Sequence, residues 1–136
     1  MPHQNIPRRR ERIIVAAAAL EFARLWIKHV FPDAPGPAAV AEDTYITRAI
    51  WFGHLSGQPL NLRALVDYTG IPRMTLVSAL ERMEGRGLVA RNKGGCYVIS
   101  AEAVQRAVQA DTLDRVIDLI LRTADALRKE QLRAPR

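Results

Sequence analysis

The stretch "YTGIPRMTLVSALERMEGRGLV", residues 68–89, constrains the fold most, because it ends one helical pattern and begins another almost at once. Gly70 can adopt the left-handed conformation that ends a helix, and Pro72 suits the first position of the next helix, where a missing N–H is no loss. The helix before the turn has an inner face of Leu62, Leu65 and Val66. The helix after it has an apolar face at helical spacing, made of Leu76, Ala79, Leu80 and Met83. So tight a connection, with Ile71 as a buried anchor, predicts a helix-turn-helix.

A small hairpin is predicted directly after the second helix. Two short β runs, 88–91 and 96–99, flank the sequence "NKGG". The pair Gly94-Gly95 predicts a two-residue turn, because both of its positions can need a positive φ. Ahead of the motif, Asn61 stands where the first helix needs an amino-terminal cap, and Leu60 predicts a very short extended segment.

Helices are also predicted on both sides of this motif. One covers residues 44–57, "TYITRAIWFGHLSG", with Asp43 as its cap. Its inward-facing residues are expected to be Tyr45, Ile46, Ala49, Ile50 and Phe52. On the other side, Ser100 can cap a helix and Asp111 can cap a second one, so the sequence leaves open whether residues 101–132 form one helix or two.

Residues 59–100, "PLNLRALVDYTGIPRMTLVSALERMEGRGLVARNKGGCYVIS", resemble the bacterial winged-helix transcription regulators. The order of elements is most similar to the multiple-antibiotic-resistance-regulator (MarR) family, and the "TGIPR" turn, the "LERMEGRGLV" exit and the Gly-rich hairpin tip carry the resemblance. It implies a mainly α fold with a small β wing (α+β), in which a winged helix-turn-helix DNA-binding domain spans residues 43–100. It also implies long dimerisation helices on both sides of this domain, at 13–31 and 101–132.

The terminal segments themselves favour a homodimer. Residues 9–31 predict a helix that is apolar on most sides, mainly over 13–31, and residues 101–132 add an apolar stripe that a closed domain does not need. The predicted dimerisation residues are Ile13, Ile14, Leu20, Val116, Ile117, Ile120 and Leu127. The alternative is that the two helices cover each other within one chain. Residues 1–12 carry four arginines and one glutamate, which predicts a flexible basic arm that makes sequence-independent phosphate contacts.

The distribution of charge favours a nucleic acid as the partner. The net charge is +6, and residues 60–100 carry six basic and three acidic side chains. The candidate DNA-binding residues are Asn61, Arg63, Arg73, Met74, Thr75, Val77, Ser78, Arg82, Arg91, Asn92 and Lys93. The outward face of the second helix also carries Glu81, and it has fewer basic and amide side chains than the resembled family usually has there.

These features predict a sequence-specific transcription regulator that binds double-stranded DNA, as a dimeric repressor reading a pseudo-palindromic operator. The alternative function is a winged-helix adaptor that binds another protein through Met74, Val77 and the edge from Glu81 to Glu84. A small-molecule effector is a further candidate partner. The alternative is that the residues proposed to bind it only pack in the core or in the dimer interface. The candidates for lining such a pocket are Trp26, Tyr45, Trp51 and His54.

Catalysis, cofactors and membranes are not expected. The histidines lack metal-ligand spacing and a cysteine partner, and no Gly-rich phosphate loop opens a helix after a strand. The single cysteine, Cys96, fits a reducing cytoplasm. The apolar run 13–20 is shorter than the roughly 20 residues that a membrane helix needs.

Overall fold

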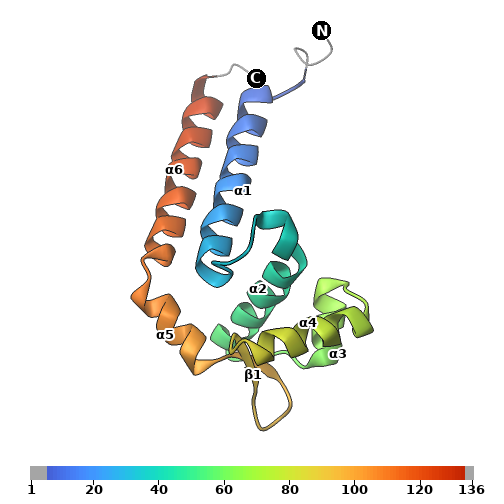
Figure 1. Cartoon of the computed structure of the whole chain (residues 1–136). Helices are drawn as coiled ribbons and strands as arrows, with labels where there is room; N and C mark the ends of the chain where they lie inside the picture. Colours follow the sequence, from blue (N-terminus) through green and yellow to red (C-terminus); the bar gives the residue numbers. More distant parts are fainter. Residues whose placement is uncertain (1–5, 134–136) are drawn as a thin grey trace. The chain divides into compact units, whose positions relative to one another are not determined.

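The computed structural model describes residues 6–133, apart from the side chain of His29, and it is mainly helical with one small antiparallel sheet (Figure 1). This confirms the predicted α+β class. The chain divides into two compact units. Ala38–Ala110 forms the central unit, and the segments on either side of it together form the terminal unit.

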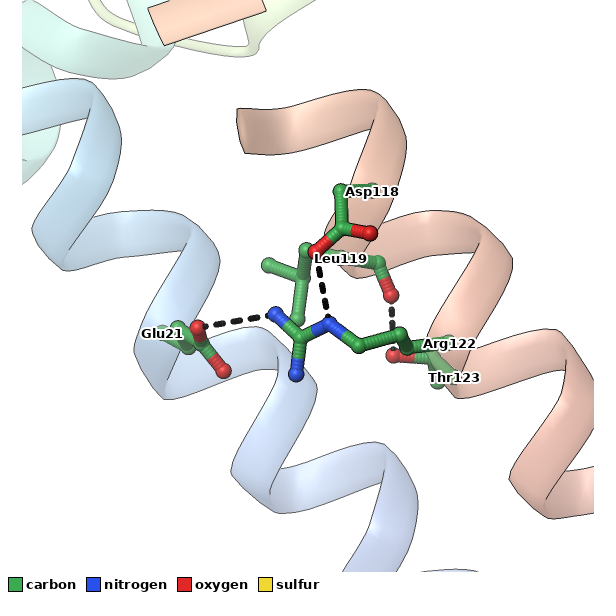
Figure 2. A network of polar contacts seen from close by, with 5 residues as sticks. All are labelled: Glu21, Asp118, Leu119, Arg122 and Thr123. Carbon is green, nitrogen blue, oxygen red and sulfur yellow. Dashed lines mark hydrogen bonds and ion pairs between the residues drawn. The ribbon is translucent and has the colours of Figure 1, made fainter. Parts of the chain in front are cut away.

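The terminal unit is a pair of long helices, α1 (Arg9–Val30) and α6 (Thr112–Arg133), which lie side by side and run in opposite directions (Figure 1). On α6 the side chain of Leu119 is only 4% exposed. Arg122 joins the two helices, because its guanidinium donates to Glu21 Oε1 at 3.3 Å and to Asp118 Oδ2 at 2.7 Å (Figure 2). The hydrogen bond to Asp118, and then that to Glu21, raise the pKa of Arg122. A second ion pair links Arg10 and Glu130 at 3.7 Å.

Most of the predicted basic arm belongs to α1. The helix begins at Arg9, as the helical pattern of residues 9–31 predicts, so the arginines at positions 9, 10 and 12 belong to it and not to a flexible arm of residues 1–12. Arg8 precedes the helix with a φ of 57° and donates from Nε to Glu11 Oε1 at 2.9 Å. A carboxylate in the first turn stabilises a helix start, which explains why these arginines are helical. Residues 1–5 of the predicted arm lie outside the described residues.

The carboxyl-terminal segment forms two helices. α5 (Ala101–Gln109) is followed by Ala110, whose ψ of 147° is extended, and α6 begins at Thr112. α5 groups with the central unit, so only the second helix of the predicted 101–132 segment belongs with α1. Ser100 caps α5 as predicted, since its Oγ accepts from Ala103 N–H at 3.0 Å.

The central unit begins with a short 3-10 turn (Pro37–Val40) that leads into α2 (Ala41–Leu55). α3 (Leu62–Thr69), α4 (Arg73–Gly85) and the strands β1 (Val89–Arg91) and β2 (Tyr97–Ile99) follow in that order. The core is apolar and closely packed. Its side chains exposed by less than 2% include Ile46, Ile50, Leu65, Leu76, Leu80 and Met83.

The predictions for the turn between α3 and α4 are confirmed, except for the place of Pro72. Asn61 Oδ1 accepts from Ala64 N–H at 2.8 Å and so caps α3. Gly70 has a φ of 71°, and its N–H donates to Val66 O at 2.9 Å. Ile71 is buried beneath the turn, and Pro72 lies one position before α4 rather than within it. The predicted buried face of α4 is also correct at all four positions.

Three predictions for α2 were wrong. The helix begins at Ala41 and has no side-chain cap, so Asp43 lies in its first turn and does not cap it. Tyr45 is 47% exposed and Phe52 is 61% exposed, although both were expected to face inward. These two positions are seven residues apart and share one face, and Ile46 and Ile50 already turn the opposite face toward the core.

The hairpin also differs from the predicted two-residue turn. Arg91 pairs with Tyr97, and Asn92 N–H donates to Cys96 O at 2.8 Å, which leaves three residues in the loop. Only the second glycine of the predicted pair, Gly95, has a positive φ, at 78°. A three-residue loop closed by one left-handed glycine is another common hairpin form. Leu60 forms the predicted short extended segment, as a one-residue bridge to Tyr97.

Replacing Gly70 with Ala should destabilise the central unit by about 1–2 kcal/mol, because a residue with a Cβ is strained at this φ. A Cβ at Gly70 would meet nothing within 4 Å, so the cost comes from the backbone alone. The free energy of unfolding from chemical denaturation measures it. Gly85→Ala is the control, since that position is equally open but has no positive φ and ends α4, where alanine favours the helix by up to about 1 kcal/mol. A loss of similar size in both variants would contradict the backbone explanation.

Candidate nucleic-acid interface

The outer face of α4 is open to solvent along its length. Because Leu76 and its three partners occupy the buried face, Thr75, Ser78 and Glu81 lie exposed on the other side. Met74 in the first turn is 75% exposed, and Val77 is half-buried. The start of this helix has no side-chain cap, so its first N–H groups are not engaged by a capping side chain. The exposures therefore agree with those predicted for a recognition helix, and the contacts to DNA stay a prediction.

Ion pairs within the chain separate the six basic residues of segment 60–100 into two groups. Arg82 on α4 donates from one terminal nitrogen to both oxygens of Asp43 on α2, at 3.0 and 3.3 Å. Arg91 on β1 pairs with Glu84 at 3.3 Å, and its guanidinium lies 5.6 Å from the centre of the Tyr97 ring. Both arginines are therefore held by the protein itself, although both were candidate DNA-binding residues.

The second group has no such partner within the described part of the chain. Arg63 at the start of α3, Arg73 at the start of α4, Arg86 after α4 and Lys93 in the hairpin loop are all exposed, and their side chains make no ion pair or hydrogen bond there. Arg86 was not among the candidate site residues. Its position directly after the predicted helix could have indicated an exposed cation, because cations are favourable at the carboxyl ends of helices.

Two asparagines that were candidate DNA-binding residues have structural roles. The side-chain oxygen of Asn61 caps α3. The side-chain oxygen of Asn92 accepts from Gly94 N–H at 3.0 Å and from Cys96 N–H at 2.9 Å, which shapes the hairpin loop. Lys93 therefore stands in a loop that is fixed by its own neighbour.

The candidate dimerisation residues lie on α1 and α6 of the terminal unit. Ile13, Leu20, Ile117 and Ile120 are exposed, while Ile14, Val116 and Leu127 are half-buried. Val15, Leu113 and Leu121 are also exposed apolar side chains, although they are not among the predicted dimerisation residues. At 100° per residue, positions 113, 117, 120 and 121 of α6 fall on one side of the helix, and Leu119 lies about 145° away, near the opposite side.

The candidate effector residues are divided between the two units. Trp26 belongs to α1, whereas Tyr45, Trp51 and His54 belong to α2. The effector pocket therefore stays a prediction. On the same helix α2, burial lowers the pKa of Arg48 below its ordinary value.

Within residues 6–133, no group of histidine, cysteine and carboxylate side chains is arranged to hold a metal ion. The described helices include none that is both long enough and apolar enough to cross a membrane. Comparison of the chain with models of known protein families gives no match, and comparison with curated proteins gives no significant match.

Proposed function

We propose that this protein is a dimeric transcription regulator that binds double-stranded DNA in a sequence-specific manner, and that it acts as a repressor. The central unit would be a winged helix-turn-helix, with α4 as its recognition helix and the β1–β2 hairpin as its wing. The observation that carries the proposal is the combination of an uncovered helix face with four exposed cations of the same unit that have no partner within residues 6–133, Arg63, Arg73, Arg86 and Lys93. The resemblance of residues 59–100 to the MarR family supports it.

The chemistry of these positions suits the two parts of DNA recognition. Unpaired cations at helix starts and in a hairpin loop can bind phosphates, which supplies affinity without reading the sequence. The hydroxyl groups of Thr75 and Ser78 can bond to base edges in the major groove, and the Thr75 methyl group can contact thymine. Glu81 can accept a hydrogen bond from a cytosine amino group. Few side chains on α4 read bases, so a single copy would have modest specificity.

A homodimer accounts for the apolar surface of the terminal unit. Two antiparallel helices alone cover only one side of each other, and bundles of this kind need further helices to bury the rest. The exposed apolar side of α6, with Leu113, Ile117 and Ile120, is typical of such a bundle. Two copies would place two recognition helices on a pseudo-palindrome whose half-sites lie about one helical turn apart.

Lys93→Ala should weaken binding to every DNA sequence alike and should reduce the slope of log K against log salt by about one unit, because one phosphate contact is lost. Anisotropy titrations of genomic DNA fragments at several salt concentrations measure both quantities. Arg82→Ala is the matched control, since it removes the same charge from a side chain that Asp43 already holds. It should have the smaller effect. Equal losses from both variants would contradict the assignment of the unpaired cations to DNA.

A protein-binding adaptor is the second candidate function, and one observation favours it. Phe52 and Tyr68 stack with ring centres 6.2 Å apart, although both are exposed, and Leu55 next to them is exposed as well. Exposed apolar groups that lie together mark interaction sites on many proteins. Met74 on α4 would extend the apolar character to the recognition helix.

Glu81→Lys separates the two candidate functions. On a helix that faces DNA, the change replaces a repelling charge with an attracting one, so affinity for non-specific DNA should rise, by about tenfold at low salt. On an adaptor, binding to DNA should stay negligible. Competition with poly-anionic heparin controls for simple charge binding. If Glu81→Lys brings no gain and Lys93→Ala no loss, the adaptor becomes the better proposal.

The double variant Ile117→Gln, Ile120→Gln should convert the dimer to a monomer while the central unit stays folded. Burial of each isoleucine contributes about 1.5–3 kcal/mol, so losing both should weaken association by more than about a hundredfold. Sedimentation equilibrium measures the change, and circular dichroism checks the fold. Leu55→Gln with Val108→Gln is the control, because it replaces two exposed apolar residues of the central unit. A wild-type protein that is monomeric at micromolar concentration would end the dimer proposal.

A further inference from the structure

The outer edge of β2, which faces away from β1, carries two backbone N–H groups that need acceptors outside the hairpin. In an antiparallel pair only every second residue bonds across the sheet, and here the bonded pairs are Asn92 with Cys96, Ala90 with Val98 and Leu88 with Ser100. The N–H groups of Tyr97 and Ile99 therefore point away from β1. Both of these residues are buried, with exposures of 6% and 4%. A buried backbone N–H needs an acceptor, because leaving it unpaired is costly.

Leu60 supplies the acceptor for the first of these groups. Tyr97 N–H donates to Leu60 O at 2.8 Å, as in a third strand that is one residue long. The same antiparallel register would place Gln58 opposite Ile99. Gln58, however, belongs to the turn after α2, where its N–H donates to Gly53 O at 2.9 Å. Within the described residues, this segment pairs with β2 at Tyr97 alone, and no strand residue is paired with Ile99 on that side.

A histidine side chain takes the place of the missing strand. Ile99 N–H donates to Nδ1 of His54, in the last turn of α2, at 3.0 Å. This bond uses the lone pair of Nδ1, so it requires an imidazole whose hydrogen is on Nε2. The end of α2 is thus bonded directly to the second strand of the hairpin.

The junction around this bond is tight. A Cβ added to Gly53, the residue before His54, would lie 3.0 Å from Gln58 O and 3.0 Å from Leu60 Cγ. The end of α2 and the Leu60 segment therefore lie too close for a side chain between them, and Leu60 in turn is bonded to β2 through Tyr97. The hairpin loop, in contrast, has its hydrogen bonds only within residues 92–96 of the described chain. The direction in which the loop points is set at the base of the hairpin.

We infer that His54 is a positioning residue, which fixes the β1–β2 hairpin on α2 and so sets where Lys93 meets the DNA. This inference rests on the proposed function, because it needs a hairpin that contacts DNA. The imidazole itself contacts no DNA in this scheme. Its role is to hold one edge of the sheet that the short Leu60 segment cannot hold alone.

Three substitutions of His54 separate the acceptor from the rest of the side chain. His54→Asn keeps an oxygen acceptor close to the position of Nδ1, and His54→Gln moves the acceptor one bond further out. His54→Leu removes the acceptor and favours the helix more than histidine does, so it does not weaken α2 through helix propensity. His54→Gln serves as a second polar variant if His54→Leu fails to fold.

Hydrogen exchange measured by NMR on the whole chain tests the anchor without DNA. In His54→Leu the Ile99 amide should exchange about tenfold faster or more, which corresponds to the loss of one hydrogen bond. The Tyr97 amide is the internal reference, since its acceptor is unchanged. His54→Asn should restore the protection of Ile99 more fully than His54→Gln. Unchanged exchange of Ile99 in His54→Leu would overturn the inference.

DNA binding tests the positioning role. Affinity should fall about three- to tenfold in His54→Leu, return in His54→Asn, and show no further loss when His54→Leu is added to Lys93→Ala, because the contact to be positioned is then already absent. A full additive loss in that double variant, or no loss in His54→Leu alone, would overturn the positioning role. A wild-type protein that binds no DNA would overturn the proposed function together with this role, and the exchange of Ile99 would still show whether His54 anchors the strand.

Discussion

The burial of one side of α4 is the constraint on which the rest of the central unit depends. Leu76, Ala79, Leu80 and Met83 are almost completely removed from solvent, and they fix how the helix is rotated about its axis. At 100° per residue, that rotation leaves Thr75, Ser78 and Glu81 on the outside. α3, α2 and the strands then arrange themselves around the same apolar core, through Leu65, Ile46 and Ile50. The candidate site is thus a consequence of packing: the uncovered face exists because the opposite face is filled.

Ion pairs then determine which of the exposed arginines are available to a ligand. The central unit has several arginines on its surface, but Asp43 and Glu84 each hold one of them, at 3.0 and 3.3 Å. An exposed pair of this kind contributes little to stability, commonly 0 to about 1 kcal/mol. Its greater effect here is on availability, since a guanidinium bonded to a carboxylate must give up that partner before it binds a phosphate. The unpaired cations at the starts of α3 and α4 and in the hairpin loop can bind a phosphate without breaking an ion pair. They are therefore the phosphate-binding residues of the proposed interface.

The sequence predicted those features that depend on a few neighbouring residues. The caps by Asn61 and Ser100, the left-handed Gly70 and the buried face of α4 all follow from local hydrogen bonds or helical spacing. The features it missed depend on residues far apart in the chain. Arg82 and Asp43 are 39 positions apart, so their pairing cannot be read from either segment. Phe52 faces solvent because the opposite side of α2 fills the core, and Ile99 bonds to a histidine because the Leu60 segment is too short to continue as a strand.

The small number of base-reading side chains on α4 gives the terminal helices a role in DNA binding under the proposed function. Under the proposed function, one copy offers two hydroxyl groups and one carboxylate to the bases, and each good base contact is worth only about 1–3 kcal/mol. A single copy would therefore discriminate poorly between sequences. Joining two copies makes the second binding event intramolecular, and the overall affinity then rises by orders of magnitude without any new contact to DNA. The exposed isoleucines of α6 would form the contact between the two copies. In a monomer they would stay exposed and lower the solubility. Specificity in such a protein resides in the spacing of the two half-sites as much as in the residues that touch them.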